Sequence, residues 1–462
     1  MKKSWLGVMA FLLLIWQANA QNKLPVGVFD SGTGGLTVMQ AMLTLDAFNN
    51  KTGEPGSDGK PDFENEIYQY LADQANMPYG NYAAENKTDL LKEHILKNMN
   101  FFLGGVYQVK KDTLWEIYNK LPVKMIVIAC NTATAYALSD IKNYVQQQGK
   151  NIPVIGVIDA GAKAALHYQQ THAAGTIGVF ATAGTVASNG YPRTIELFAG
   201  QMNMQVPSIV SQGGVGLAES IDRDWSYYSD TLTATRNSYK GPSIKNVKLP
   251  IDTLLLAAYN FDKSSNKLLC EMDGSRCTDM QINDPANYVR YHLVSLLEKM
   301  KMQHYSLPMN TLILGCTHYP YMKDTIARVL TELYNYKVNG AYRYRDVLAE
   351  QVALIDPAIE TAKDAYMALR SQMLQQKKKI KSGTNTFFIS VPNTSLPGVQ
   401  LQGDGWFTYT YKYGRNAGEG KEYVKYVPFD MANISSATYS RFKSVLPDVY
   451  TALLRKVPGL AK

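Results

Sequence analysis

VKMIVIACNTATAYALSDIKNYVQQQ, residues 123–148, joins a strand-like apolar run to a helix-like stretch through a short polar turn. The same succession begins at five other apolar, β-branched runs: PVGVFD (25–30), IPVIGVID (152–159), TIGVFAT (176–182), NTLILGC (310–316) and VALIDP (352–357). Alternating strands and amphipathic helices are typical of α/β domains with parallel sheets. Ligands of such sheets bind at the carboxyl ends of the strands, so the residues after each run are the candidate site residues.

Two pairs of motifs indicate an internal repeat. GVFDSG (27–32) resembles GVFATA (178–183), and IACNT (128–132) resembles LGCTH (314–318). In both halves a strand with a Gly, Ser or Thr turn precedes a strand that ends in cysteine. This order predicts two related halves of one architecture.

We therefore expect two related three-layer α/β domains with parallel sheets. The first domain is predicted to comprise residues 21–145 and 340–462, and the second residues 146–339. Polar, turn-rich stretches at 49–63 and 222–288 are predicted insertions. The tail from about residue 382 is interpreted as an elaboration of the first domain, with no function assigned.

The first twenty residues resemble a secretory signal peptide. Lys2 and Lys3 precede the apolar run Leu6 to Trp16, and Ala18-Asn19-Ala20 is a small-residue cleavage site. A membrane anchor is the alternative, but the run is much shorter than the ~20 residues that span a bilayer. We expect an exported protein, periplasmic or secreted, that has no membrane partner after cleavage behind Ala20.

Charge gives little support for a nucleic-acid partner. The formal net charge is +8, and removal of Lys2 and Lys3 with the leader lowers it to +6. The basic residues are scattered along the chain, which does not predict a basic face. A hydrophobic fraction of 46% is ample for packed cores.

The four cysteines occur in two different contexts. Cys270 and Cys277 belong to the polar stretch KLLCEMDGSRC, where a local disulfide is plausible but not decided by the sequence. Cys130 and Cys316 each follow an apolar strand. Asn131 and Thr132 are good helix-capping residues, so the helix dipole is expected to lower the pKa of Cys130 below its free value of about 8.5.

A lone cysteine after a strand is more often a small buried hydrophobe than a catalyst. Two cysteines at equivalent points of two related halves favour a reaction that needs two similar groups. Inversion of an α-carbon is such a reaction, because one group removes a proton from one face while the other returns a proton to the opposite face. Thiols suit it because their pKa can be tuned.

The turn Asp30-Ser31-Gly32-Thr33-Gly34-Gly35 is a third candidate element. A dinucleotide fingerprint is the rival interpretation, but Thr37 stands where its third glycine belongs, and no Gly-Lys-Ser/Thr follows as in a P-loop. A turn that holds a small carboxylate or ammonium group fits the residues better.

These motifs resemble the glutamate racemases of the aspartate/glutamate racemase family. The matching segments cover most of residues 24–365 in the family's order: PVGVFDSGTGGLTVMQAM, YLADQANMPYGNY, IVIACNTATAYAL, IPVIGVIDAGAKAA, IGVFATAGTVASNGYPR, LILGCTHYPYM and VALIDPAIETA. The resemblance implies two α/β domains with the active site between them, no cofactor and no metal.

The resemblance also implies roles for individual residues. Cys130 and Cys316 match the catalytic pair, and Asp30 and His318 would lie beside them and tune them. The positions that match substrate contacts are Asp30, Ser31, Tyr79, Gly80, Asn131, Thr132, Thr317 and His318, and Thr182 and Thr185 match a further stretch near the substrate.

The expected function is cofactor-independent racemisation of an acidic amino acid, with L-glutamate to D-glutamate preferred and aspartate as an alternative. Family members supply D-glutamate for peptidoglycan in the cytoplasm, so the leader is a departure. A second departure is SQGGVGLAES around Glu219, where the family more often has a cysteine–proline pair. An exported amino-acid binding protein on an inactive racemase scaffold is the alternative from another class. The expected partner is a small-molecule amino acid, and a homodimer is one option for assembly.

Overall fold

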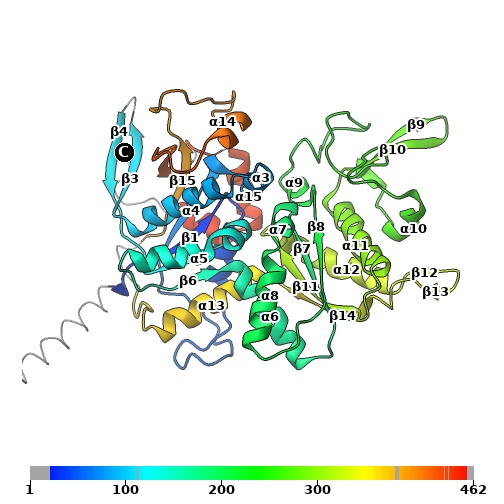
Figure 1. Ribbon diagram of the computed structural model, residues 1–462, viewed down its shortest axis with the longest axis horizontal. Coiled ribbons are helices and arrows are strands. Elements are labelled where there is room, and N and C mark those ends of the chain that lie inside the picture. The colour runs from blue at the N-terminus through cyan, green and yellow to red at the C-terminus, as the bar shows by residue number, and fades with distance from the viewer. Residues whose placement is uncertain (1–20, 112–113, 380–383, 431, 435, 455–462) are drawn as a thin grey trace, which may run out of the picture. The chain divides into compact units, whose positions relative to one another are not determined.

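The computed structural model describes residues 21–111, 114–379, 384–430, 432–434 and 436–454. The predicted signal peptide, residues 1–20, lies outside this range. The chain divides into two compact units (Figure 1). One contains the described residues up to Ala160 and those from Ala358 onward, and the other runs from Gly161 to Pro357. In the described part of the chain, no helix has the length and apolar character needed to cross a membrane.

The first unit contains a six-stranded sheet in the order β16-β15-β2-β1-β5-β6. All neighbouring strands are parallel except β16, which is antiparallel to β15 at the edge. The strands are β1 (Val26–Asp30), β2 (Tyr68–Ala72), β5 (Met125–Ile128), β6 (Val154–Gly156), β15 (Thr386–Pro392) and β16 (Val424–Pro428).

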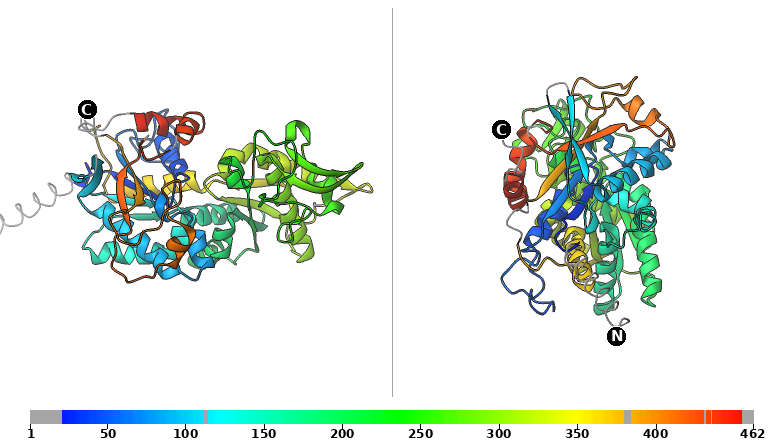
Figure 2. Two further views of the ribbon diagram at one scale, coloured as in Figure 1. Left: turned by 90° about the horizontal axis from the view of Figure 1, so that it is seen from above. Right: turned by 90° about the vertical axis from the view of Figure 1, so that its left-hand side faces the viewer.

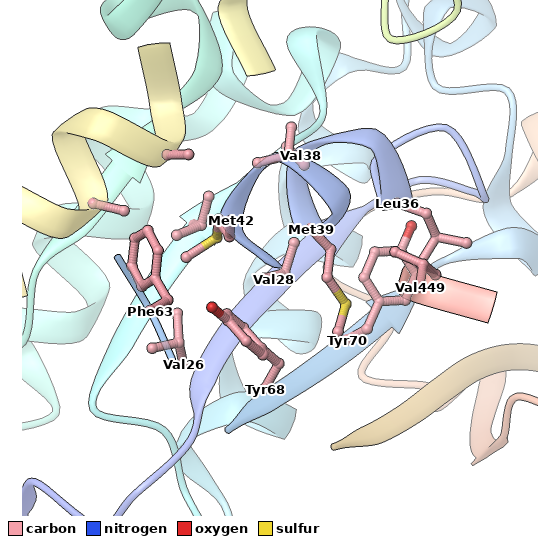
Figure 3. Close-up of a cluster of buried hydrophobic side chains, with 14 of the residues drawn as sticks. Val26, Val28, Leu36, Val38, Met39, Met42, Phe63, Tyr68, Tyr70 and Val449 are labelled. Carbon is pink, nitrogen blue, oxygen red and sulfur yellow. The ribbon is translucent and has the colours of Figure 1, made fainter. Parts of the chain in front are cut away.

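Helices cover both faces of this sheet because successive strand side chains point to opposite sides. Val26 and Val28 of β1 belong to a cluster with α2 (Leu36–Thr44), α13 (Pro357–Ser371) and α16 (Pro447–Leu454). Figure 3 shows Val28 and Tyr70 turned toward Leu36 and Met39, with Val449 from the end of the chain in the same cluster. Phe29 points the other way, toward α4 (Thr88–Leu103) and α5 (Asn131–Gln147).

The second unit contains a four-stranded, fully parallel sheet in the order β14-β11-β7-β8. Its strands are β7 (Thr176–Ala181), β8 (Ile209–Gly213), β11 (Met309–Gly315) and β14 (Leu348–Ile355). Helices α11 (Pro285–Met302) and α12 (Lys323–Tyr334) lie side by side and share a core with β11 (Figure 1).

The two units share one strand order. Each sheet contains a set of four adjacent parallel strands, which we number by their order along the chain. In both sheets these four strands lie side by side in the order second, first, third, fourth: β2-β1-β5-β6 and β8-β7-β11-β14. This confirms the prediction of two related α/β domains with parallel sheets, which rested on the repeated motifs.

The predicted domain boundaries differ from those of the structure. Residues 146–160 belong to the first unit because β6 pairs with β5, and residues up to Pro357 belong to the second because β14 pairs with β11. The run IPVIGVID, predicted as one strand, is a strand only at Val154–Gly156. Helix α6 (Val157–Thr171) begins directly after it, with Asp159 in the first turn where a carboxylate is favourable.

The stretch 222–288 lies wholly within the second unit. Its first part, residues 222–252, contains no helix or strand. Its second part contains the short helix α10 (Leu256–Tyr259) and a hairpin of β9 (Leu268–Asp273) and β10 (Arg276–Ile282). The Cys270–Cys277 disulfide, which the sequence left open, closes this hairpin with the Cα atoms 5.7 Å apart.

Another hairpin, which the sequence did not predict, belongs to the first unit. Strands β3 (Val106–Lys111) and β4 (Leu114–Asn119) lie beside β15 and β16, as Figures 1 and 2 show. The ring centroids of Tyr107 and Phe388 are 4.9 Å apart, and the Lys425 ammonium lies 4.0 Å from the centroid of the Trp115 ring.

Candidate active site

Strand pairing gathers seven of the twelve candidate residues at one edge of the first sheet. Asp30 at the end of β1 pairs with Ala72 at the end of β2, and Phe29 pairs with Ile128 of β5. The residues that follow these strands, including Ser31, the loop 73–80 and Cys130, therefore emerge at the same edge. This is the edge where ligands of parallel sheets bind.

The Asp30 carboxylate shapes the glycine-rich turn that follows it. Its Oδ2 accepts the N–H groups of Gly32 at 3.2 Å and Gly35 at 2.8 Å, and the Tyr70 hydroxyl donates to the Gly32 carbonyl at 2.6 Å. A Cβ on Gly35 would lie 2.5 Å from the Cβ of Asp30, so this position requires glycine. The turn is therefore organised by its own aspartate.

Cys130 is the N-cap of α5. Its Sγ accepts the N–H of Ala133 at 3.4 Å, and its S–H donates to Ser31 Oγ at 3.6 Å. The sequence predicted that Asn131 and Thr132 cap the helix, but they are its first two residues, and both are buried. The cap is thus the candidate catalytic side chain itself.

The pKa of Cys130 shifts in the opposite direction to the predicted one. Burial raises it, since the side chain is only 5% exposed, and the negative charge of Asp30 raises it further, to about 12. The contacts with Ala133 and Ser31 lower it but do not offset these effects. At neutral pH Cys130 is a neutral thiol, so it is ready to donate a proton.

Tyr79 and Gly80 close the loop that follows β2. The Tyr79 hydroxyl donates to Asp73 Oδ2 at 2.5 Å, its ring centroid lies 6.4 Å from that of Phe29, and Gly80 begins α3 (Gly80–Ala84). Burial raises the pKa of Tyr79 well above its ordinary value. The Tyr79 hydroxyl therefore stabilises the loop from within.

The second sheet carries an equivalent edge. Ala181 of β7 pairs with Gly315 of β11, which places Thr182 and Cys316 at neighbouring strand ends. Thr182 Oγ1 caps α7 (Ala183–Ala187) by accepting the N–H of Thr185 at 3.2 Å, and the Thr182 hydroxyl donates to Thr185 Oγ1 at 3.0 Å. The two threonines that the sequence singled out are therefore in direct contact.

Cys316 lies beside an imidazole that is held by a carboxylate. Cys316 Sγ is 3.8 Å from Nδ1 of His318, and Nε2 of His318 is 3.0 Å from Asp222 Oδ2. Thr317, between them in the sequence, is half-buried. Unlike Cys130, Cys316 does not cap an α-helix, because the chain first forms a 3-10 turn, η4 (Tyr319–Met322), and α12 begins only at Lys323.

His318 carries a positive charge at neutral pH. Burial lowers its pKa, but the hydrogen bond to Asp222 and the contact with Cys316 outweigh burial and raise it to about 10. This positive charge lies directly beside the sulfur of Cys316. Glu219, whose own pKa is raised by burial, also interacts with His318.

Asp222 was not predicted as a site residue. It belongs to none of the recognised motifs, and it is the first residue of the predicted insertion. Only the tertiary structure brings it to His318, 96 positions away in the chain. The sequence contains no spacing signal that could have revealed this pair.

Comparison with known proteins gives a consistent result. A curated glutamate racemase from Streptococcus sanguinis is 32% identical over 51% of this chain and 69% of its own length. The chain belongs to the glutamate racemase family. It is an amino-acid racemase, and therefore an isomerase. A glutamate racemase from Levilactobacillus brevis is 27% identical over 79% of this chain and 85% of its own length.

Two further comparisons complete this result. No protein-family model matches the racemase chain. The crystal structure of a glutamate racemase isoform from Bacillus anthracis aligns with a TM-score of 0.44 and 22% identity, covering 79% of this chain and 88% of that one.

The predicted site residues of this racemase thus form two sets, each assembled at the carboxyl edge of one sheet. No group of three or more His, Cys, Asp or Glu side chains suited to a metal ion occurs among the residues that the structure describes. The sets are Asp30, Ser31, Tyr79, Gly80, Cys130, Asn131 and Thr132 in the first unit, and Thr182, Thr185, Cys316, Thr317 and His318 in the second.

Proposed function

We propose that this racemase interconverts L- and D-glutamate without a cofactor, with Cys130 and Cys316 acting on opposite faces of the α-carbon. One observation carries the proposal. Cys130 lies two residues after the end of β5 and Cys316 one residue after the end of β11, and in each unit this strand is the third along the chain of the four parallel strands whose order is the same in both units. Two similar groups at equivalent positions fit a reaction that treats two mirror-image substrates alike.

The surroundings of the two sulfurs support this assignment. The raised pKa of Cys130 keeps a proton on its sulfur, while the positively charged imidazole of His318 lies 3.8 Å from the sulfur of Cys316. In one direction the Cys316 thiolate takes the α-proton, so that the C–H bond breaks and an S–H bond forms. The Cys130 thiol then protonates the carbanion from the other face. The reverse direction exchanges these roles.

Glutamate is the proposed substrate because the curated relatives that match over most of their length are named glutamate racemases. Aspartate is the alternative. The test incubates the reduced protein, residues 21–462, separately with L-glutamate, D-glutamate and L-aspartate, and follows the enantiomers by chiral chromatography. We expect both glutamate enantiomers to approach equal amounts, since enantiomers have equal free energy. Turnover of aspartate alone would correct the substrate, and no turnover would favour the amino-acid binding protein.

We also propose that the enzyme is exported and acts on amino acids released from peptidoglycan or from the diet. The leader-like residues 1–20 and the Cys270–Cys277 disulfide support export, because disulfides persist mainly in oxidising compartments. The mass of the protein purified from the periplasm or the medium should correspond to a chain that starts at Gln21. Recovery from the cytoplasm with residues 1–20 intact would contradict export.

A further inference from the structure

The tail of the chain holds the loop that carries Tyr79 and Gly80. Helix α14 (Tyr409–Gly414) lies next to α3 (Figure 1), where the ring centroids of Tyr413 and Tyr82 are 4.9 Å apart. From this position, three consecutive loop residues receive hydrogen bonds. Lys412 Nζ donates to the Met77 carbonyl, the Tyr413 hydroxyl donates to the Pro78 carbonyl at 3.2 Å, and Arg415 Nη2 donates to Asn76 Oδ1 at 3.1 Å.

The two cations of this contact are buried. Lys412 is 9% exposed, and burial together with the nearby charge of Arg415 lowers its pKa to about 8. The guanidinium carbon of Arg415 lies 4.7 Å from the centroid of the Phe407 ring and 4.5 Å from that of Tyr423. Taking a cation out of water is costly unless its hydrogen bonds compensate. Two buried cations that donate hydrogen bonds to the same short loop indicate that the conformation of this loop is important.

The same loop contacts the glycine turn next to Cys130. A Cβ on Gly32 would lie 2.5 Å from Met77 Sδ and 3.3 Å from Gln74 Oε1, so the loop lies directly on Gly32. Gly32 follows Ser31, whose Oγ receives the hydrogen bond from Cys130. A continuous series of contacts therefore leads from Lys412 through Met77 to the turn that touches the catalytic thiol.

We propose that Lys412 is a positioning residue that fixes the loop 73–80 against the glycine turn, so that the C-terminal tail is part of the catalytic apparatus. The expected effect of Lys412 on the KM for glutamate rests on the proposed racemisation. The expected protection of Cys130 by the loop does not depend on that function.

The kinetic test compares Lys412→Met with two matched variants. Lys421→Met makes the same change in the same tail at a side chain that is 56% exposed and pairs with Glu419, two residues away. Lys412→Arg keeps the cation. Loss of one charge-assisted hydrogen bond at a positioning loop should raise the KM for glutamate about tenfold and change kcat less. Lys421→Met should match the wild type, and Lys412→Arg should recover part of the loss.

The second test measures alkylation of Cys130 by iodoacetamide in a Cys316→Ala background, where Cys130 is the only free cysteine. Lys412→Met should accelerate alkylation several-fold, while Lys421→Met should not change it. Circular dichroism and thermal unfolding check that each variant is folded. If Lys412→Met does not fold, Tyr413→Phe, which removes only the hydroxyl that reaches Pro78, replaces it in both tests with a smaller expected effect.

The outcomes separate the two proposals. A folded Lys412→Met variant with unchanged KM and unchanged alkylation overturns the positioning role. Faster alkylation in a protein whose wild type does not racemise glutamate supports the positioning role and refutes the proposed function.

Discussion

Replacing Asp222 by asparagine tests whether the positive charge of His318 activates Cys316. The Asp222 carboxylate lies 3.0 Å from Nε2 of His318 and is 37% exposed. A hydrogen bond between charged groups contributes about 1.5–3 kcal/mol, and solvent at a partly exposed carboxylate favours the lower value. Because about 1.4 kcal/mol corresponds to a factor of ten in rate, Asp222→Asn should lower kcat/KM about tenfold near neutral pH.

The pH profile of the same variant gives an independent readout. His318 keeps its charge up to about pH 10 in the wild type, and without the carboxylate it should lose the charge at lower pH. The alkaline limb of kcat/KM should therefore move to lower pH in Asp222→Asn. Asp230→Asn is the control, because Asp230 makes an exposed ion pair with Arg223 nearby in the same segment.

The charge of His318 also makes the free energy of unfolding depend on pH. The folded-state pKa of His318 is raised, so its contribution to the free energy of unfolding is complete below the unfolded value of about 6.5 and is lost as pH rises through about 10. The wild type should exceed Asp222→Asn in unfolding free energy mainly at low pH. Wild-type kcat/KM in Asp222→Asn at every pH would show that the charge of His318 does not activate Cys316.

Three further predictions concern the first unit. Alkylation of Cys130 should be slow at pH 8 and should accelerate about tenfold per pH unit up to at least pH 10, because its pKa is raised to about 12; a plateau near pH 8.5 would contradict the effect of burial. Lys124→Met should lower the unfolding free energy measured in urea by about 3–5 kcal/mol, because it leaves the buried carboxylate of Glu66 without its ion pair. An unchanged urea midpoint would show that the ion pair contributes nothing to stability. Gly35→Ala should reduce kcat/KM and destabilise the fold by about 1–3 kcal/mol, because its Cβ would overlap the side chain of Asp30; wild-type kinetics would show that the turn adapts.

The sequence was informative where local pattern determines structure. Parallel α/β architecture follows from runs such as MIVIAC before a helical period, and the repeat of two cysteine-ended strands predicted two sheets of the same order. The boundaries were missed because they depend on which strand pairs with which. A three-residue strand such as Val154–Gly156 becomes part of the first sheet only through its pairing with β5.

The candidate site was predicted less completely, because its electrostatics depend on distant residues. Placing Cys130 at a helix start led to a predicted drop in its pKa, yet burial and Asp30 outweigh the helix terminus. Neither Asp222 nor Lys412 occurs in a motif, and each reaches the site through a fold contact, one to His318 and one to Met77. Sequence patterns identify residues that touch a substrate more readily than residues that support them.

In the proposed mechanism two thiols invert one carbon together. Incubating Cys130→Ala and Cys316→Ala with each glutamate enantiomer in heavy water, and following deuterium at the α-carbon by NMR, measures what each thiol does alone. We predict that neither variant inverts glutamate, and that each exchanges the α-proton of one enantiomer only, with the opposite preference in the other variant. Inversion by either variant, or the same preference in both, would contradict the two-thiol mechanism.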